Sequence, residues 1–168
     1  GNSIPETEVK FHGNLNSVVG IEQLKALSPD IIVVNGTRIL SENLLKSVDA
    51  TFINTHVGIT PKYRGVHGGY WAMASNDPEN CGVTVHIVDK GIDTGGILFQ
   101  DIISVNEDDN FFTYPIKQLH KAIPLMKRAI IDSHNNKVHI KQQNMESKLW
   151  YHPTIFDYFY NRLFKGVK

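Results

Sequence analysis

The sequence predicts an α/β fold built on a mostly parallel sheet, and three neighbouring segments carry this prediction. The run Ile31–Val34 is continuously apolar, which is typical of a strand covered on both faces in a parallel sheet. Ser41 is a good N-cap for a helix over residues 42–48, and Glu42 in the first turn suits the helix dipole. Residues 50–55 are then predicted to form the next strand. A strand, a helix and a strand at this spacing form a βαβ unit.

The segments on either side of this unit supply the remaining layers. Residues 14–27 have a helical spacing of apolar side chains that stops at Ser28-Pro29-Asp30. Residues 69–76 are predicted to form a short helix, and residues 81–88 a strand. Residues 97–105 form another strand whose alternation is less regular, so an antiparallel placement stays open. We therefore expect helices on both sides of a sheet whose central strands are residues 31–34, 50–55 and 81–88.

The second half of the chain predicts two more helices. Apolar residues recur at alternating spacings of three and four from Ile116 to Ile130, the pattern of an amphipathic helix. Pro124 lies inside this pattern and is expected to kink the helix or divide it in two. Residues 138–141 are expected to form a short edge strand. Pro153 then opens a last helix, whose apolar side chains are Ile155, Phe156, Phe159, Leu163 and Phe164.

Composition narrows the class of protein. The 168 residues fit one domain, and 41% hydrophobic with 20% charged residues is ordinary for a globular protein. Seventeen basic residues balance seventeen acidic ones, so net charge gives no argument for nucleic-acid or membrane binding. Cys81 is the single cysteine, which excludes a disulfide framework or a cysteine metal cluster within one chain. No apolar run is long enough to span a bilayer, and we expect a cytoplasmic protein.

The chain is organised around residues 53–65, where a predicted strand breaks into a loop. Asn54 and His56 are two residues apart, so their side chains share one face of an extended chain. An amide donor beside an imidazole can stabilise one developing oxyanion and move one proton. Asp93 lies in a second, glycine-rich loop after the strand over residues 81–88, where a carboxylate can approach His56. These three side chains are candidates for a catalytic group.

These stretches resemble a known family. Asn-x-His followed by Pro-Lys-Tyr-Arg-Gly, then Gly-Val-Thr-Val-His and Asp-x-Gly-Ile-Asp-Thr-Gly-Gly, is similar to the folate-dependent formyltransferases. That family includes glycinamide ribonucleotide formyltransferase, methionyl-tRNA formyltransferase and the amino-sugar N-formyltransferases. The match runs from about residue 30 to about residue 130. The resemblance implies a three-layer, Rossmann-like sheet, a catalytic domain over residues 1–150, and an aromatic C-terminal helix over residues 151–168 that packs on it.

The resemblance also implies the reaction and its residues. The reaction is attack of an amine on the formyl group of 10-formyltetrahydrofolate, with no metal. Asn54 is expected to hydrogen-bond the formyl oxygen, His56 to stabilise the oxyanion or shuttle the proton, and Asp93 to orient His56 or accept the amine proton. The folate is expected between residues 38–40 and the glycine-rich loop. The implied cofactor-binding residues are Arg38, Ile39, Leu40, His86, Asp89 and Gly91.

Several of these residues also have purely structural interpretations. Asn54 suits a strand end, because asparagine side chains bond to loop backbone. Ile39 and Leu40 are equally well explained as core residues. His86 is more readily explained as a buried strand histidine supporting the site than as a proton carrier. The glycines of the second loop, Gly91 among them, are first of all devices for unusual backbone.

Two other classes of function stay open. A hydrolytic metal site would use His56, His67, His86 and Asp93, although no local ligand pair such as His-x-x-x-His supports it. A non-catalytic, folate-binding module is the other alternative. Turnover separates the enzyme from the module, and bound zinc would favour the hydrolase.

The acceptor is expected to be a small amine, either an amino sugar or glycinamide ribonucleotide. In the purine enzyme, proline and serine follow the catalytic histidine, whereas Val57 and Gly58 stand here, which weakens the case for the ribonucleotide. Family members also open with a strand, a glycine-rich turn and a helix that we do not find in this sequence. We therefore expect a competent folate side, an incomplete acceptor side, and self-association through an exposed sheet edge.

Overall fold

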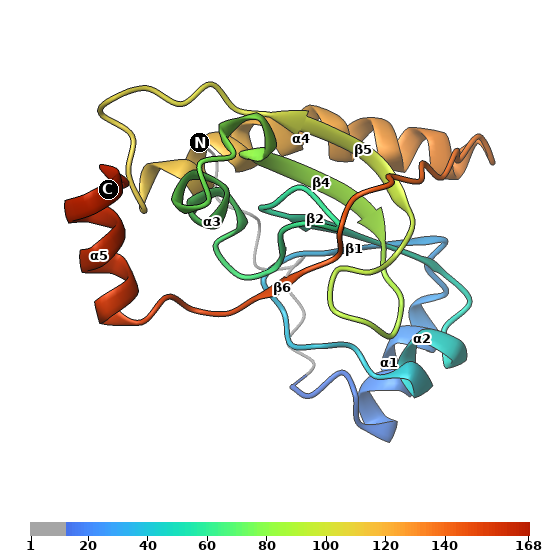
Figure 1. The fold of residues 1–168 in the computed structure, drawn as a ribbon. Helices are drawn as coiled ribbons and strands as arrows, with labels where there is room; N and C mark the ends of the chain where they lie inside the picture. The colour runs from blue at the N-terminus through green and yellow to red at the C-terminus, as the bar shows by residue number, and fades with distance from the viewer. Residues whose placement is uncertain (1–12) are drawn as a thin grey trace, which may run out of the picture.

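The computed structural model describes residues 13–168, and this part of the chain forms a four-stranded sheet between two helical layers (Figure 1). The strands lie in the order β1 (Ile31–Val34), β2 (Thr51–His56), β4 (Gly82–Ile87) and β5 (Ile97–Ile102). The helices are α1 (Val18–Leu27), α2 (Glu42–Ser47), α3 (Gly68–Ala74), α4 (Thr113–His134) and α5 (Ile155–Lys165). The predicted α/β class is therefore confirmed. The polar start of the chain, residues 1–12, lies outside the described residues.

The strand directions correct one part of the prediction. β1 and β2 are parallel, but β2 with β4 and β4 with β5 are antiparallel, so within residues 13–168 the sheet is mixed. A parallel return needs a crossover that runs the length of the sheet. Helix α3 has only seven residues and contacts β4, α4 and the short 3-10 turn Pro78–Asn80. The chain therefore re-enters the sheet from the end at which β2 leaves it, and the antiparallel placement left open for β5 is the observed one.

The two faces of the sheet are buried against different helices. Phe52 is buried in a cluster with Ile21 of α1 and Leu44 of α2, whereas Ile53 is buried in a cluster with Ala129 of α4. This alternation follows from the two-residue period of a strand. It confirms that the sheet has helices on both sides. Ser41 caps α2 as predicted, because its Oγ accepts a hydrogen bond from the Leu44 N–H at 3.2 Å.

Helix α4 is longer and less buried than its sequence pattern suggests. It runs unbroken through Pro124, so the predicted division does not occur. Ala122 and Ala129 face the sheet, while Ile116 and Ile123 are 67% and 68% exposed. Beside them lies an apolar groove of about 590 Å³ between α4 and the exposed side chain of Val33. Neither α4 nor any other described helix has both the length and the apolarity needed to cross a membrane.

The C-terminal segment is attached by a short strand, by ring contacts of Trp150 and Tyr158, and by polar contacts. Residues 138–141 form only one bridge, between Lys141 and Ile97, instead of the predicted strand. A two-residue strand β6 (Leu149–Trp150) pairs with β3 (Arg64–Gly65), and α5 follows it. Asn161 of α5 donates to the Tyr70 hydroxyl at 3.0 Å. The apolar side chains predicted for this helix are exposed. The division of the chain into a catalytic domain over residues 1–150 and a C-terminal helix over residues 151–168 stays a prediction.

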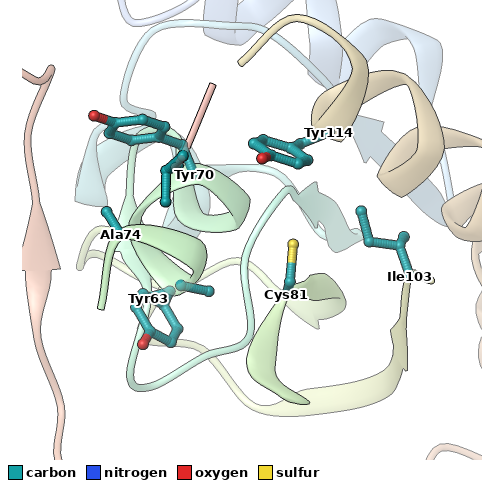
Figure 2. Close-up of a cluster of buried hydrophobic side chains, with 8 residues drawn as sticks. Tyr63, Tyr70, Ala74, Cys81, Ile103 and Tyr114 are labelled. Atoms are coloured by element: carbon teal, nitrogen blue, oxygen red, sulfur yellow. The ribbon is translucent and has the colours of Figure 1, made fainter. Parts of the chain in front are cut away.

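A third buried cluster holds the loop after β2 (Figure 2). Tyr63, Tyr70 and Tyr114 surround Cys81, and burial raises the pKa of the Cys81 thiol to about 12. This thiol therefore stays protonated and packs as a small apolar group. The hydroxyl of Tyr63 donates to Asp77 Oδ2 at 2.5 Å, and the Lys62 ammonium lies 2.5 Å from the same oxygen. These contacts fix residues 62 and 63 to the body of the molecule.

The Tyr63–Asp77 bond makes a stability prediction. Tyr63→Phe keeps the ring but removes a buried hydroxyl that donates to a charged carboxylate. We expect the free energy of unfolding to fall by about 1–3 kcal/mol, measured by urea denaturation. The matched control is Tyr160→Phe, at an exposed tyrosine of α5, which should change stability by less than about 0.5 kcal/mol. Equal effects of the two variants would show that the buried bond does not anchor the loop.

Candidate active site

The predicted site residues meet in one cavity of about 500 Å³ at the end of the sheet where β2 leaves it. β2 and β4 supply Asn54, His56 and His86. The other walls are the loop after β1, the loop after β4 and strand β6 with the residues that follow it. All nine predicted site residues line the cavity: Arg38, Ile39, Leu40, Asn54, His56, His86, Asp89, Gly91 and Asp93.

The register of β2 with β4 places the polar side chains of the site. Asn54 lies directly opposite His86, and His56 directly opposite Thr84, so these four share one face of the sheet. Phe52 lies earlier on the same face, beneath α1 and α2. Thr84 Oγ1 donates to the Gly58 carbonyl at 2.7 Å and accepts from the Thr60 N–H at 3.1 Å. Thr84 thereby ties the loop after β2 to β4.

The amide of Asn54 is oriented by a short chain of hydrogen bonds. His86 Nδ1 lies 2.7 Å from the Ile87 carbonyl, which can only accept, so Nδ1 carries hydrogen. In the neutral ring His86 Nε2 is then an acceptor, and Asn54 Nδ2 lies 3.2 Å from it. One amide hydrogen of Asn54 is used in this bond and the other is left for the cavity. His86 therefore positions Asn54, as the structural interpretation of the sequence suggested.

His56 is held between a carbonyl and a carboxylate. Its Nε2 lies 2.6 Å from the Tyr63 carbonyl, so this nitrogen carries hydrogen, and its Nδ1 lies 3.3 Å from Asp93 Oδ2. Burial lowers the pKa of His56, and the charge of Asp93 opposes that effect. A protonated ring satisfies both partners, whereas the surrounding core disfavours its charge. His56 is thus a group that can take up and release one proton at Nδ1.

Asp93 connects the two histidines and the loop after β2. Its Oδ2 accepts the Gly65 N–H at 2.9 Å, and its Oδ1 lies 3.5 Å from His86 Nε2. Burial alone would raise the pKa of Asp93, but the neighbouring His86 ring, the charge of His56 and the hydrogen bond from the Gly65 N–H together hold the pKa below its usual value. Asp93 has φ of 50°, the left-handed conformation. Its carboxylate therefore stays ionised beside His56.

The two predicted folate walls are both held by internal bonds. Asn16 donates to the Ile39 carbonyl at 2.9 Å and accepts from the Ser41 N–H at 2.8 Å, which fixes the loop after β1. Ile39 is 65% exposed, so the core interpretation is wrong for Ile39, whereas Leu40 is buried. In the other wall, Asp89 accepts from the Gly91 N–H and the Thr94 hydroxyl, at 3.0 and 2.6 Å. Asp89 therefore shapes its own turn.

The metal interpretation has no geometric support among residues 13–168. His67 does not join His56, His86 and Asp93; it lies 3.0 Å from His152, between ring nitrogens. No group of three or more histidine, cysteine, aspartate or glutamate side chains in this part of the chain is arranged to hold a metal ion. The remaining polar residues suit proton transfer and hydrogen bonding.

Sequence reasoning missed three contributors to the site. They are the Tyr63 carbonyl, the Gly65 N–H and the wall formed by residues 149–152. For Gly65 the signal in the sequence was the glycine itself. The structure requires a glycine there, because φ is +95° and an added Cβ would lie 2.2 Å from the Trp150 carbonyl. No local pattern identifies the wall, because residues 149–152 are about ninety positions from the loop they contact.

The buried ring of His56 predicts how stability depends on pH. Because the pKa of His56 is lowered on folding, the unfolded chain binds a proton that folded His56 does not. The wild-type protein should therefore lose stability as the pH falls below about 6.5. In His56→Gln, the loss between about pH 7.5 and about pH 5.5 should be smaller, as measured by urea denaturation. His67→Gln is the comparison variant, because burial also lowers the pKa of His67. An unchanged pH dependence in His56→Gln would contradict the assignment.

Comparisons with known proteins point to one family. The family model described as formyl transferase matches residues 14–130. A methionyl-tRNA formyltransferase of Caldanaerobacter subterraneus subsp. tengcongensis is 31% identical over 136 residues, which are 80% of this chain and 43% of the relative. The chain spans less than half the length of this and of the other first curated relatives that it matches.

Solved structures give the same result at the level of the fold. A sugar N-formyltransferase from Shewanella sp FDAARGOS_354 has a TM-score of 0.69 at 19% identity, covering 86% of this chain and 63% of that one. An N-formyltransferase from Helicobacter canadensis, in complex with folinic acid and dTDP-3-aminofucose, has a TM-score of 0.55 at 29% identity, covering 70% and 43%. From the match over residues 14–130 and the formyltransferase-type fold, the chain belongs to the formyl transferase family.

Proposed function

We propose that this protein transfers a formyl group from 10-formyltetrahydrofolate to the amine of a small acceptor, of the amino-sugar or glycinamide ribonucleotide type. The observation that carries the proposal is the meeting of Asn54, His56 and Asp93 in one cavity that the two folate walls also line. Family membership supports the same reaction. We place the reaction in the cytoplasm, as the sequence analysis expects.

The cavity fits a reduced folate. Ile39 and Ile92 present apolar side chains to it, while the turn over residues 89–93 presents backbone. A flat pterin ring with a hydrogen-bonding edge needs such a combination of apolar wall and exposed peptide groups. The Helicobacter canadensis structure is reported with folinic acid, and a sugar 3N-formyltransferase at 25% identity is reported with 5-N-formyl-THF. When bound, the donor supplies an activated formyl carbon with a folate nitrogen as leaving group.

The residues of this chain then have separate tasks. The free amide hydrogen of Asn54 hydrogen-bonds the carbonyl oxygen, on which negative charge grows during attack by the amine. Neutral His56 accepts the proton of the attacking amine at Nδ1, directly or through one water, and the imidazolium so formed stabilises the same charge beside Asp93. His56 then returns this proton to the folate nitrogen as that nitrogen leaves. The low pKa of Asp93 keeps a counter-charge beside the ring throughout.

The nature of the acceptor rests on two supports. The Helicobacter canadensis enzyme is solved with a nucleotide-linked amino sugar, whereas the first curated relatives are methionyl-tRNA formyltransferases. This chain has equal numbers of acidic and basic residues, so it lacks the excess positive charge with which proteins bind RNA phosphates. We therefore favour a small acceptor. A screen of amino-sugar nucleotides, glycinamide ribonucleotide and methionyl-tRNA with 10-formyltetrahydrofolate tests the choice directly.

Substitution of the catalytic group should lower transfer while leaving folate binding intact. We expect His56→Ala to reduce the rate by about 10²–10⁴-fold, with similar losses in Asn54→Ala and Asp93→Ala. The combined variants should lose little more, because the three side chains act as one unit. The measurement is transfer rate at saturating donor, with the dissociation constant of 5-formyltetrahydrofolate from calorimetry.

The exposed residue Phe156 of α5 supplies the control, since Phe156→Ala should change neither quantity. Full activity in His56→Ala would refute the mechanism. Binding of 5-formyltetrahydrofolate without transfer to any acceptor would support the folate-binding module instead. Failure of the wild-type chain to bind 5-formyltetrahydrofolate would remove the basis for both.

We also propose that two copies of the chain associate through strand β1. Within the described residues β1 pairs only with β2, and its other edge carries no proline or charged side chain. An antiparallel pair centred on Val33 keeps the Val33 side chains of both copies on one face. The second copy would then cover the apolar groove beside α4. The interface would thus combine strand pairing with a hydrophobic contact.

This association makes its own prediction. Val33→Lys should shift the protein toward the monomer in sedimentation velocity experiments across a range of concentrations, because a charge at the two-fold axis opposes pairing. Leu163→Lys, at an exposed apolar position of α5, is the matched control and should not. A wild-type monomer at all concentrations, or dissociation by Leu163→Lys alone, would contradict the proposal.

A further inference from the structure

The cavity has a wall that neither the catalytic group nor the folate uses, formed by residues 149–152. The backbone of residues 148–150, at the start of this wall, is bound to the loop after β2 by three hydrogen bonds. Arg64 N–H donates to the Lys148 carbonyl, Val66 N–H to the Trp150 carbonyl and Lys148 N–H to the Pro61 carbonyl, each at 3.1 Å. The wall therefore has a fixed position relative to Gly65, whose N–H binds the Asp93 carboxylate.

Aromatic side chains fix the wall from behind. The Trp150 ring stacks on Trp71, with 4.7 Å between centroids, and its indole donates to the Lys62 carbonyl at 3.0 Å. The indole of Trp71 donates to the Tyr151 carbonyl at 2.9 Å. The main chain of Tyr151 is thus held on both sides, and only its side chain is left to move.

Tyr151 lines the cavity and is 70% exposed. Among residues 13–168 its side chain makes no ring contact or hydrogen bond. A rigidly mounted aromatic ring loses little conformational entropy on binding and offers an apolar face with a polar tip. Such a ring suits the C–H face of a sugar.

His152 stands next to this ring and also lines the cavity. Its Nδ1 lies 3.0 Å from His67 Nε2, and the His67 ring packs on Phe111 at 4.5 Å between centroids. If His67 donates this bond, His152 carries its own hydrogen at Nε2, the nitrogen that is not engaged by His67. An imidazole N–H beside a sugar-binding ring is suited to a phosphate oxygen.

We propose that residues 151 and 152 form the acceptor subsite of this protein, and that the acceptor is a phosphorylated sugar carrying the amine. The sugar ring stacks on Tyr151, its phosphate faces His152, and its amine points toward Asp93 and His56. The inference rests on the proposed function and deepens it, because it assigns the acceptor class from a wall that is independent of the folate walls.

Calorimetric titration of the 168-residue chain tests the subsite, with dTDP-3-aminofucose and glycinamide ribonucleotide as probes. At least one probe should bind the wild-type chain, and Tyr151→Ala should weaken that binding about tenfold, or about 1.4 kcal/mol. Tyr151→Phe should bind within about twofold of wild type, because the ring and not the hydroxyl makes the contact. His152→Ala should weaken binding of the same probe, because both probes carry phosphate. Phe156→Ala on α5 should not weaken it.

A parallel titration with 5-formyltetrahydrofolate separates this inference from the proposed function. Tyr151→Ala should leave the folate dissociation constant unchanged. Loss of folate binding in Tyr151→Ala would show that this wall contacts the folate, and would overturn the inference. Acceptor binding that does not change in Tyr151→Ala would also overturn it. Absence of binding by both acceptor probes would also overturn it, even with folate binding intact. Absence of folate binding in the wild-type chain would count against the proposed function.

Discussion

The hydrogen bond between the His56 ring and the Tyr63 carbonyl is the contact on which the site depends. It sets which nitrogen of His56 carries hydrogen and turns the other nitrogen toward Asp93. The carbonyl is itself fixed because the Tyr63 ring is buried and its hydroxyl is bound to Asp77. Gly58 must lack a side chain here, since an added Cβ would lie 2.4 Å from that carbonyl and 2.6 Å from His56 Nε2. The packing of Tyr63 in the core therefore determines which nitrogen of His56 faces Asp93.

Asp93 performs a similar joining role from the opposite loop. One carboxylate meets His56, His86 and the Gly65 N–H, so it connects β2, β4 and the loop after β2. Gly65 also approaches β6 too closely for any side chain. A movement of residues 149–152 would therefore displace Gly65 and, through its N–H, the Asp93 carboxylate. The wall of residues 149–152 and the pair formed by His56 and Asp93 are parts of one connected structure.

The sequence predicted that Asn54, His56 and Asp93 would lie together, because part of the information for this is local. Asn54 and His56 share a strand face by the two-residue period of a strand, which is a local property. The prediction failed where long-range packing decided the outcome. The direction of β4 depends on where α3 packs, and the exposure of Ile116 and Ile123 depends on how much of α4 the sheet covers. Neither property is encoded in the spacing of the residues concerned.

Taken alone, the sequence determined the α/β class, the helix and strand positions in the first half of the chain, and nine of the residues that line the cavity. Those features follow from periodicity, caps and glycines within a few residues of one another. Only the tertiary structure decided the mixed strand directions, the tautomer of His56 and the position of residues 149–152 against the site. Each of these depends on contacts between segments far apart in the chain, whose pairing is selected by the packing of the whole core and not by any local pattern.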